Sequence, residues 1–264
     1  MVKMRNRLQF VKPIEPNTVV ALVDVDNWHF EGTSHTYKST LVEIVAELLE
    51  KVVENVDDVE SVQIRLYGGW TEDGLYTDIA SEVAAARQAV DPFPIARGER
   101  DPLIRGDIHL ATSLVSNPDV ELGDLVRKRK GPPRIRLSPT FLNALCSTRE
   151  DCPARILKRF TASADKKCPA SGCEVRSDEV FSTRQQKMVD TLMACDLLEL
   201  CRDDNVIAIF LVTSDSDFLP PLVQAARLAS TRIHVHCNSE YWSDEALSIM
   251  LEQGVNYVGP RRVA

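Results

Sequence analysis

The sequence predicts an α/β protein with a doubly wound, mostly parallel sheet and a cysteine-containing insertion. Three observations carry this prediction. Short apolar runs alternate with stretches of helical periodicity, two of the apolar runs end in clustered carboxylates, and one irregular segment contains four cysteines. Strands that alternate with helices are joined by right-handed crossovers and pair in parallel. A chain of 264 residues accommodates one such domain with an insertion.

The first half of the chain contains two strand patterns and two helix patterns. TVVALVD, residues 18–24, is a continuous apolar run typical of a buried parallel strand, and SVQIRLYGG, residues 61–69, alternates as a second strand. Apolar residues at helical spacing predict helices over 38–55 and 75–90. These four elements predict the first βαβα unit of the sheet.

The second half begins with an irregular segment, residues 140–180, which we interpret as an insertion. Before it, residues 107–115 and 134–138 are expected to form a strand pair on either side of a basic loop. After it, six elements are expected, namely a helix over 182–202, a strand over 206–214, a helix over 218–229, a strand over 231–237, a helix over 243–252 and a strand over 255–258. The domain thus spans 18–264, with residues 1–17 as an N-terminal extension.

Carboxylates follow two of the predicted strands. Asp24, Asp26 and Asn27 end the first, and Asp215 and Asp217 follow the strand that begins at 206. The carboxyl ends of parallel strands share one edge of a sheet, where ligands bind in α/β folds. Hard oxygen ligands suit Mg²⁺ or Mn²⁺. The sequence therefore predicts a metal site at this edge.

The predicted helix over 182–202 carries two more acids, Asp190 and Asp196. Six residues turn a helix by about 240°, so the two acids lie on different faces, and only one is expected at the metal. Capping is the alternative role for an acid after a strand, and Asp217 fits the N-cap of the helix expected from 218. Capping does not explain three converging acidic segments, which favours the metal site.

Four motifs occur in a characteristic order: VDVDN at 23–27, YGGW at 67–70, KMVDTLMACD at 187–196 and VTSDSDF at 212–218. Together they resemble the NYN domain of the PIN-like nuclease superfamily, over about residues 18–236. The resemblance implies a doubly wound α/β domain that binds divalent metal and cleaves RNA. It also places Met188 where a glycine is common in relatives.

The resemblance assigns roles to individual residues. Asp24, Asp190 and Asp215 would hold the metal directly or through water, with Asp217 as an outer ligand or a water-positioning group. Asn27 would orient a metal-bound water or the phosphate, and Lys187 would contact phosphate. Asp26 falls at a position that varies in the family. Metal ions held in this way activate a water and neutralise charge on the scissile phosphate.

The net charge of −8 argues against general attraction to nucleic acid, but the charge is unevenly distributed. Four consecutive basic residues are expected to position RNA on the protein, namely Arg127, Lys128, Arg129 and Lys130. The alternative is a solvated surface loop, which Gly131, Pro132 and Pro133 would suit. Basic residues continue into the insertion at Arg155, Lys158 and Arg159.

Four cysteines of the insertion form two pairs, Cys146 with Cys152 and Cys168 with Cys173. Disulfides are disfavoured in the cytosol, and paired thiolates can close a tetrahedral structural zinc site. The spacings are looser than the common two-residue knuckle, so unconnected thiols are the alternative. The other three cysteines are expected in the core, namely Cys195, Cys201 and Cys237.

Aromatic side chains flank the first two motifs, namely Trp28, His29, Phe30 and Trp70. They are expected either to stack on RNA bases or to pack a loop against the core. The histidines of strand-like segments, His109, His234 and His236, are expected to be structural.

These observations predict a cytoplasmic, metal-dependent endoribonuclease, a hydrolase with Mg²⁺ or Mn²⁺ at its site, RNA as its partner and zinc in its insertion. One alternative is a non-catalytic RNA-binding or regulatory module. Another is a DNA-directed nuclease or a phosphatase that uses the same metals. No apolar run is long enough to span a membrane. Self-association and binding to a regulatory protein partner both remain open.

Overall fold

The computed structural model describes residues 14–27, 37–90, 95–96, 103–132, 135–142, 145–237 and 242–259. The chain divides into two compact units. The sheet unit consists of the residues up to Leu125 and from Lys187 onward, and the insertion unit is Val126–Gln186. The predicted insertion at 140–180 therefore lies inside a longer structural unit.

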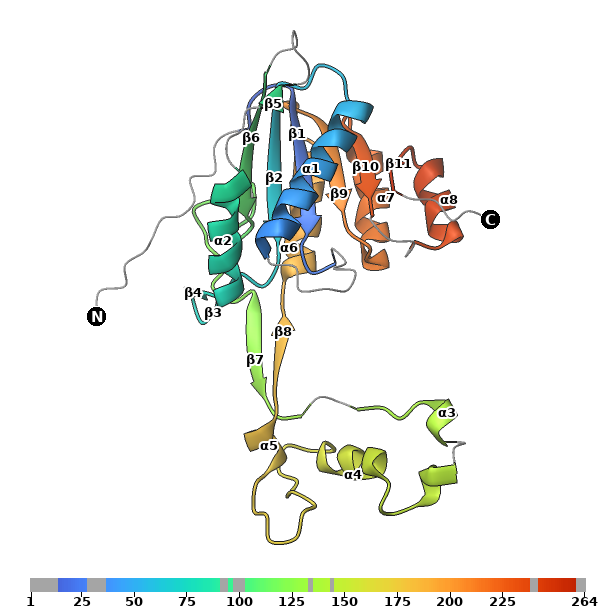
Figure 1. Ribbon diagram of the computed structural model, residues 1–264. Coiled ribbons are helices and arrows are strands. Elements are labelled where there is room, and N and C mark those ends of the chain that lie inside the picture. Colours follow the sequence, from blue (N-terminus) through green and yellow to red (C-terminus); the bar gives the residue numbers. More distant parts are fainter. Residues whose placement is uncertain are drawn as a thin grey trace, which may run out of the picture. The chain divides into compact units, whose positions relative to one another are not determined.

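A seven-stranded sheet forms the centre of the sheet unit, in the order β11-β10-β9-β1-β2-β6-β5 (Figure 1). Its strands are β1 (Thr18–Asp24), β2 (Ser61–Tyr67), β5 (Ile95–Ala96), β6 (Leu103–Leu110), β9 (Val206–Val212), β10 (Arg232–His236) and β11 (Asn256–Tyr257). Strand β5 pairs antiparallel with β6, and the other neighbouring strands of this sheet pair in parallel. A separate small hairpin consists of β3 (Thr71–Glu72) and β4 (Leu75–Tyr76).

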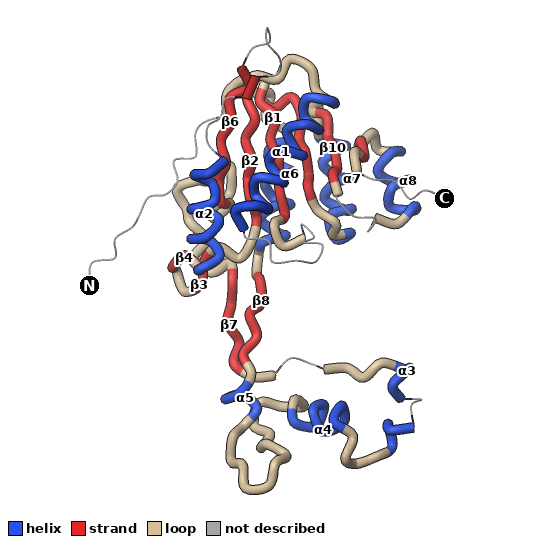
Figure 2. Tube along the Cα trace, viewed as in Figure 1, coloured by secondary structure: helices blue, strands red, loops and turns tan. Residues whose placement is uncertain are grey.

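Helices cover both faces of the sheet (Figures 1 and 2). They are α1 (Tyr37–Asn55), α2 (Asp78–Val90), α6 (Val189–Leu200), the 3₁₀ turn η2 (Ser216–Phe218), α7 (Leu219–Leu228) and α8 (Asp244–Glu252). Helices α1 and α2 pack together on one face, and α6 and α7 pack together on the other. The prediction of a doubly wound, mostly parallel α/β fold is confirmed.

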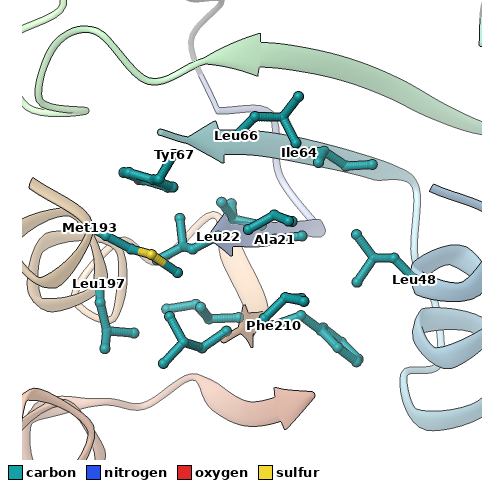
Figure 3. Packing of buried hydrophobic residues seen from close by; sticks show 14 of the residues in the cluster. Ala21, Leu22, Leu48, Ile64, Leu66, Tyr67, Met193, Leu197 and Phe210 are labelled. Carbon is teal, nitrogen blue, oxygen red and sulfur yellow. The ribbon is translucent and has the colours of Figure 1, made fainter. Parts of the chain in front are cut away.

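The central strands are buried on both faces, which explains their apolar sequences. Every residue of β1 and β2 is buried. Figure 3 shows Leu48 of α1 on one side of these strands, and Met193 and Leu197 of α6 on the other. A strand with helices on both sides needs apolar side chains at consecutive positions rather than at alternate ones.

The insertion unit contains a two-stranded ribbon and short helices. Strand β7 (Val126–Lys130) pairs antiparallel with β8 (Ser182–Gln186). The helices are α3 (Pro139–Leu142), η1 (Leu145–Thr148), α4 (Pro153–Phe160) and α5 (Ser177–Val180). Where the chain re-enters the sheet unit, the Lys187 amide donates a hydrogen bond to the Leu125 carbonyl at 2.8 Å.

Several predicted element boundaries are wrong. The basic stretch forms strand β7 rather than a loop, and its partner β8 occupies the start of the predicted helix over 182–202, which begins only at Val189. The expected pairing of 107–115 with 134–138 is wrong for the described residues, because β6 pairs in parallel with β2 and residues 135–138 form no strand. Helix α2 begins at Asp78 because Leu75 and Tyr76 form β4.

Met188, just before α6, adopts a left-handed conformation with φ of 63°. This conformation costs an L-residue roughly 1–2 kcal/mol relative to glycine. Met188 is 45% exposed, so little apolar burial would be lost on its replacement. We expect Met188→Gly to raise the free energy of unfolding by up to about 1 kcal/mol, after the larger entropy of glycine in the unfolded chain is subtracted.

Urea unfolding monitored by circular dichroism measures this effect. Met188→Ala is the matched control, because it removes the same side chain without relieving the backbone and should bring no gain. Equal stability changes in the two variants would contradict a backbone cause.

Among the described residues, no helix is long and apolar enough to cross a membrane.

Candidate functional site

The acidic ends of β1 and β9 lie at the point where the sheet reverses its strand order. From β1 the chain continues to β2 on one side, whereas β9 lies on the other side of β1. Ligands of doubly wound sheets bind outside the carboxyl ends of the strands at this reversal. Asp24 is the last residue of β1, and Asp215 lies three residues beyond the end of β9.

Asp24 is only 3% exposed and accepts hydrogen bonds from two neighbours. The Asn27 amide nitrogens donate to it, the backbone N to Oδ1 at 3.3 Å and Nδ2 to Oδ2 at 2.5 Å. Thr213 Oγ1 lies 3.4 Å from the same Oδ2. The pKa of Asp24 is raised to about 6, mainly by burial and in addition by Asp26 and Asp190, against the lowering effect of the Asn27 hydrogen bonds.

Thr213 connects the two strand ends. Its hydroxyl donates to Asp24 and accepts from the Asp215 backbone amide at 3.1 Å. Its carbonyl accepts from Trp242 Nε1 at 3.2 Å, and the Trp242 side chain is buried. Sequence reasoning missed both residues. The position of Thr213 directly before the acidic turn was a usable signal, but nothing local points to Trp242.

Asp215 caps the short turn that carries Asp217. Its Oδ1 accepts a hydrogen bond from the Asp217 backbone amide at 2.9 Å, which makes Asp215 the N-cap of η2. The N-cap of α7 is Phe218, without a side-chain cap. The capping role considered for Asp217 is therefore wrong, and the Asp217 carboxylate is exposed to solvent.

Asp190, in the first turn of α6, is repelled by other acids. Partial desolvation raises the pKa of its carboxyl, and repulsion from Asp215 and then from Asp217 raises it further. In turn, Asp190 raises the pKa of Asp24 and of Asp26, for both of which burial is the larger cause. The sheet unit thus gathers negative charge from three separate segments of the chain. Such a group of carboxylates attracts a cation.

Asp196 lies outside this group, in a buried network on the α6 side of the sheet. Its Oδ2 accepts from Arg65 Nη2 at 3.0 Å and from the Tyr67 hydroxyl at 2.6 Å, and its Oδ1 accepts from the Val115 amide at 2.8 Å. Arg65 also donates to the Ser113 carbonyl at 2.8 Å. Of the two helix acids, Asp190 is therefore the candidate site residue, and Asp196 is structural.

The candidate ligands fit a hard divalent cation in their chemistry, because all are carboxylate oxygens. Their side chains do not converge on one point. Among the described residues, no three carboxylate, thiolate or imidazole groups lie close enough together to hold a metal ion. The Asp190 and Asp217 side chains are exposed at the surface. Each can therefore adopt other rotamers, which changes where its carboxylate lies relative to Asp24.

The cysteine segment is only partly described. Cys152 is buried beside the start of α4, and Cys168 and Cys173 are half-buried in the loop that follows. The Cys146 side chain lies outside the described residues. Of the other three cysteines, Cys201 and Cys237 are buried as expected, whereas the expectation for Cys195 is wrong. It is exposed, because it lies on the outer face of α6.

Trp70 belongs to the core and is not available for base stacking. Its side chain is 1% exposed, and its Nε1 donates to the Leu66 carbonyl at 2.7 Å. Gly68 makes room for it, since a Cβ there would lie 2.8 Å from the indole ring. Trp28, His29 and Phe30 lie outside the described residues.

The three strand histidines, His109, His234 and His236, are buried in the sheet unit, as a structural role requires. The His234 ring stacks on Phe210 with centroids 4.5 Å apart.

The basic side chains expected to bind RNA are partly described. Arg127 on β7 is exposed, and Lys187 is half-buried next to α6. The side chains of Lys128, Arg129 and Lys130 lie outside the described residues, although their backbone forms β7.

Comparisons with known proteins leave the family open. No family model and no curated protein matches the chain. One solved structure, a protein of unknown function from Vibrio parahaemolyticus, is 10% identical, and the match covers 95% of this chain and 97% of that one with a TM-score of 0.38. A likeness this weak carries no argument about fold or function.

Proposed function

We propose that this protein is a metal-dependent endoribonuclease of the NYN type. The observation that supports the proposal most is the electrostatic repulsion that links Asp190 with Asp24, Asp215 and Asp217, of which Asp24 ends a strand at the reversal point of the sheet. Three of the four come from different segments, and the pKa values of Asp24 and Asp190 are raised in part by neighbouring carboxylates. Repulsion of this kind is unfavourable unless a cation relieves it.

In this proposal Asp24, Asp190 and Asp215 hold Mg²⁺ or Mn²⁺, with Asp217 as an outer ligand. The bound ion would supply an activated water and neutralise charge on the phosphate. Asn27 orients the Asp24 carboxylate through its two hydrogen bonds. The amide oxygen of its side chain and the second N–H of Nδ2 would bind a water or a phosphate. Thr213 links Asp24 to the turn that carries Asp215, because its hydroxyl hydrogen-bonds the Asp24 carboxylate and the Asp215 backbone amide.

RNA binding completes the proposal. Arg127, Lys128, Arg129 and Lys130 of β7 would neutralise phosphates, and Lys187 would do the same near the start of α6. Contacts of this kind position RNA without reading its sequence.

Cleavage assays on three substrates test the proposed activity. We expect Mg²⁺-dependent cuts within a single-stranded RNA, little action on single-stranded DNA of the same sequence, and no hydrolysis of p-nitrophenyl phosphate. Preferential cleavage of DNA, or turnover of the phosphomonoester, would assign the site to another class. RNA binding without cleavage in either Mg²⁺ or Mn²⁺ would favour a non-catalytic RNA-binding module, the reading suited to carboxylates that do not converge.

Structural zinc in the insertion unit forms a second part of the proposal. Among its described residues, Val126 and Cys152 are the only buried apolar side chains in a unit of 61 residues. Units of this size rarely hold together without a metal, a disulfide or a substantial core. A tetrahedral site of Cys146, Cys152, Cys168 and Cys173 would supply the missing constraint.

We expect the purified protein to carry about one zinc ion per chain, lost when Cys168 and Cys173 are replaced by Ser. Elemental analysis measures the zinc content. The matched control, Cys195→Ser, removes an exposed thiol of the sheet unit and should leave the zinc content unchanged. Zinc-free protein with all four thiols open to labelling would contradict the proposal.

A further inference from the structure

The two units differ sharply in charge. The insertion unit contains 14 Lys and Arg residues against 6 Asp and Glu, a formal charge of +8 within 61 residues. The whole chain has a formal charge of −8, so the remaining residues together carry −16. A unit with this excess of one sign attracts polyanions even though the chain as a whole is acidic.

Helix α4 concentrates part of this charge on one side. Arg155, Lys158 and Arg159 are spaced three and four residues apart, so they lie on one face of the helix. Lys158 and Arg159 are exposed, and Arg155 is partly exposed. Lys166, also exposed, follows in the next loop.

Three of these cations form no ion pair with a described residue, although Lys166 and Asp165 attract each other. Among the described residues, Arg155, Lys158 and Lys166 form no ion pair, in contrast to Lys167 with Glu174 and Arg149 with Asp151. Arg159 has a structural role, because its Nη2 donates to the Glu150 carbonyl at 2.8 Å. Helix α4 buries none of its residues, and Phe160 contacts Phe181 at a centroid distance of 5.7 Å.

We propose that Arg155, Lys158 and Lys166 bind the phosphate backbone of RNA, as a second cationic surface in addition to β7. This inference rests on the proposed function, in which RNA is the substrate. The residue types favour phosphate, since Arg presents a planar fork of donors and Lys a compact ammonium that both pair with phosphate oxygens. Like charges on adjacent turns repel one another, and a polyanion relieves that repulsion.

Salt-dependent RNA binding by the full-length chain tests this surface. The test variant combines Arg155→Gln, Lys158→Gln and Lys166→Gln. The matched control combines Arg105→Gln, Arg227→Gln and Arg232→Gln, which are exposed cations of the sheet unit outside the candidate site. Both triple variants remove three positive charges from the same background, so only the location of the change differs. Asp215→Asn is present throughout, so that the RNA stays intact without a chelator.

Fluorescence anisotropy with a labelled 30-nucleotide single-stranded RNA, between 50 and 200 mM KCl, gives the dissociation constants. We expect the test variant to bind at least about ten-fold more weakly at 100 mM KCl, and its log–log salt slope to be flatter by about 2, since each lost phosphate contact removes about 0.7. The control should bind within about two-fold of the parent. A test variant that matches the control in affinity and slope would overturn the inference.

Two further measurements separate the possible failures. If the protein with Asp215 intact cleaves RNA and the test variant binds like the control, the proposed surface of Arg155, Lys158 and Lys166 is wrong and the proposed activity stands. If the test variant loses binding and the protein with Asp215 intact never cleaves RNA, the surface stands and the proposed activity fails. Cosedimentation of the parent, but not of the test variant, with phosphatidylserine vesicles in the absence of RNA binding would assign the surface to a membrane instead. Should the triple variant lose its circular dichroism signal, Lys158→Gln with Lys166→Gln replaces it, because both side chains are exposed.

Discussion

Asp24→Asn and Asp215→Asn should each reduce RNA cleavage in Mg²⁺ by on the order of 10³-fold, which corresponds to about 4 kcal/mol of transition-state stabilisation. Each change removes one anionic ligand of the proposed metal, and with it part of the activation of the attacking water. The measurement is the rate of cleavage of a labelled RNA at saturating substrate.

The same change at Asp24 should stabilise the metal-free protein. The pKa of Asp24 is about 6 in the fold, against 3.8 for the free group, so between these values the native state holds a proton that the unfolded chain has lost. Ionised Asp24 therefore lowers stability as pH rises through this window. We expect Asp24→Asn to raise the free energy of unfolding at pH 7.5 by roughly 1 to 3 kcal/mol, because a shift of one unit equals about 1.4 kcal/mol and Asn cannot accept both Asn27 hydrogen bonds.

The gain should shrink as pH falls from 6 towards 4. Asp24 then binds a proton in the native state, so the parent no longer carries a buried charge that the substitution could remove. Asp244→Asn is the matched control for both effects, since it removes an exposed carboxylate of the sheet unit on α8. It should leave the cleavage rate unchanged and lower the free energy of unfolding by no more than about 0.5 kcal/mol, because Asp244 is an acid in the first turn of α8. Parent-like cleavage by the Asp24 and Asp215 variants would rule out the proposed site. A loss of stability in Asp24→Asn at pH 7.5 would show that the hydrogen bonds to the Asp24 carboxylate stabilise the fold by more than its desolvation destabilises it.

Asp196→Asn should have the opposite effect on stability. It leaves Arg65 charged, 2% exposed and without its carboxylate, and the single amide oxygen of Asn cannot replace both carboxylate oxygens as acceptors. Breaking one side of a buried ion pair costs about 3–5 kcal/mol. We expect a loss of that size in urea unfolding, with the slope of the transition unchanged.

Asp190→Asn is the matched control on the same helix, and it should leave stability unchanged or slightly raised, because Asp190 is exposed and repelled by other acids. A double variant, Arg65→Met with Asp196→Leu, should recover most of the loss, since it removes both buried charges. Equal effects of Asp190→Asn and Asp196→Asn would mean that the two acids share one environment.

The sequence predicted the elements whose signal is local. The apolar runs of β1 and β9 are continuous because helices bury both faces of these strands. A strand buried on both faces has apolar residues at consecutive positions, which can be recognised from the sequence alone. The acids at the ends of these strands were found for the same reason, since a run of apolar residues shows where a strand stops. The helical periodicity of α1 was equally direct.

Features that depend on distant partners were not predictable in this way. Strand β7 forms because it pairs with β8, more than fifty residues later, and neither segment has an apolar pattern of its own. A ribbon of mostly charged and polar residues resembles a loop to any test based on hydrophobic period. In the sequence, Met188 stands out only as a residue at a position where relatives have glycine. Its left-handed backbone conformation is seen only in the structure.

The sequence by itself determined that this protein is a doubly wound α/β protein with acids at the carboxyl ends of two parallel strands. Periodicity and strand ends are properties of neighbouring residues, so they can be read along the chain. Only the tertiary structure decided that Asp190 is repelled by Asp215 and Asp217 while Asp196 pairs with Arg65. It also decided that Thr213 hydrogen-bonds Asp24 and that Trp242 hydrogen-bonds Thr213. Those roles depend on which residues meet across the sheet, and helical rotation shows only that two acids differ in direction, not what each one faces.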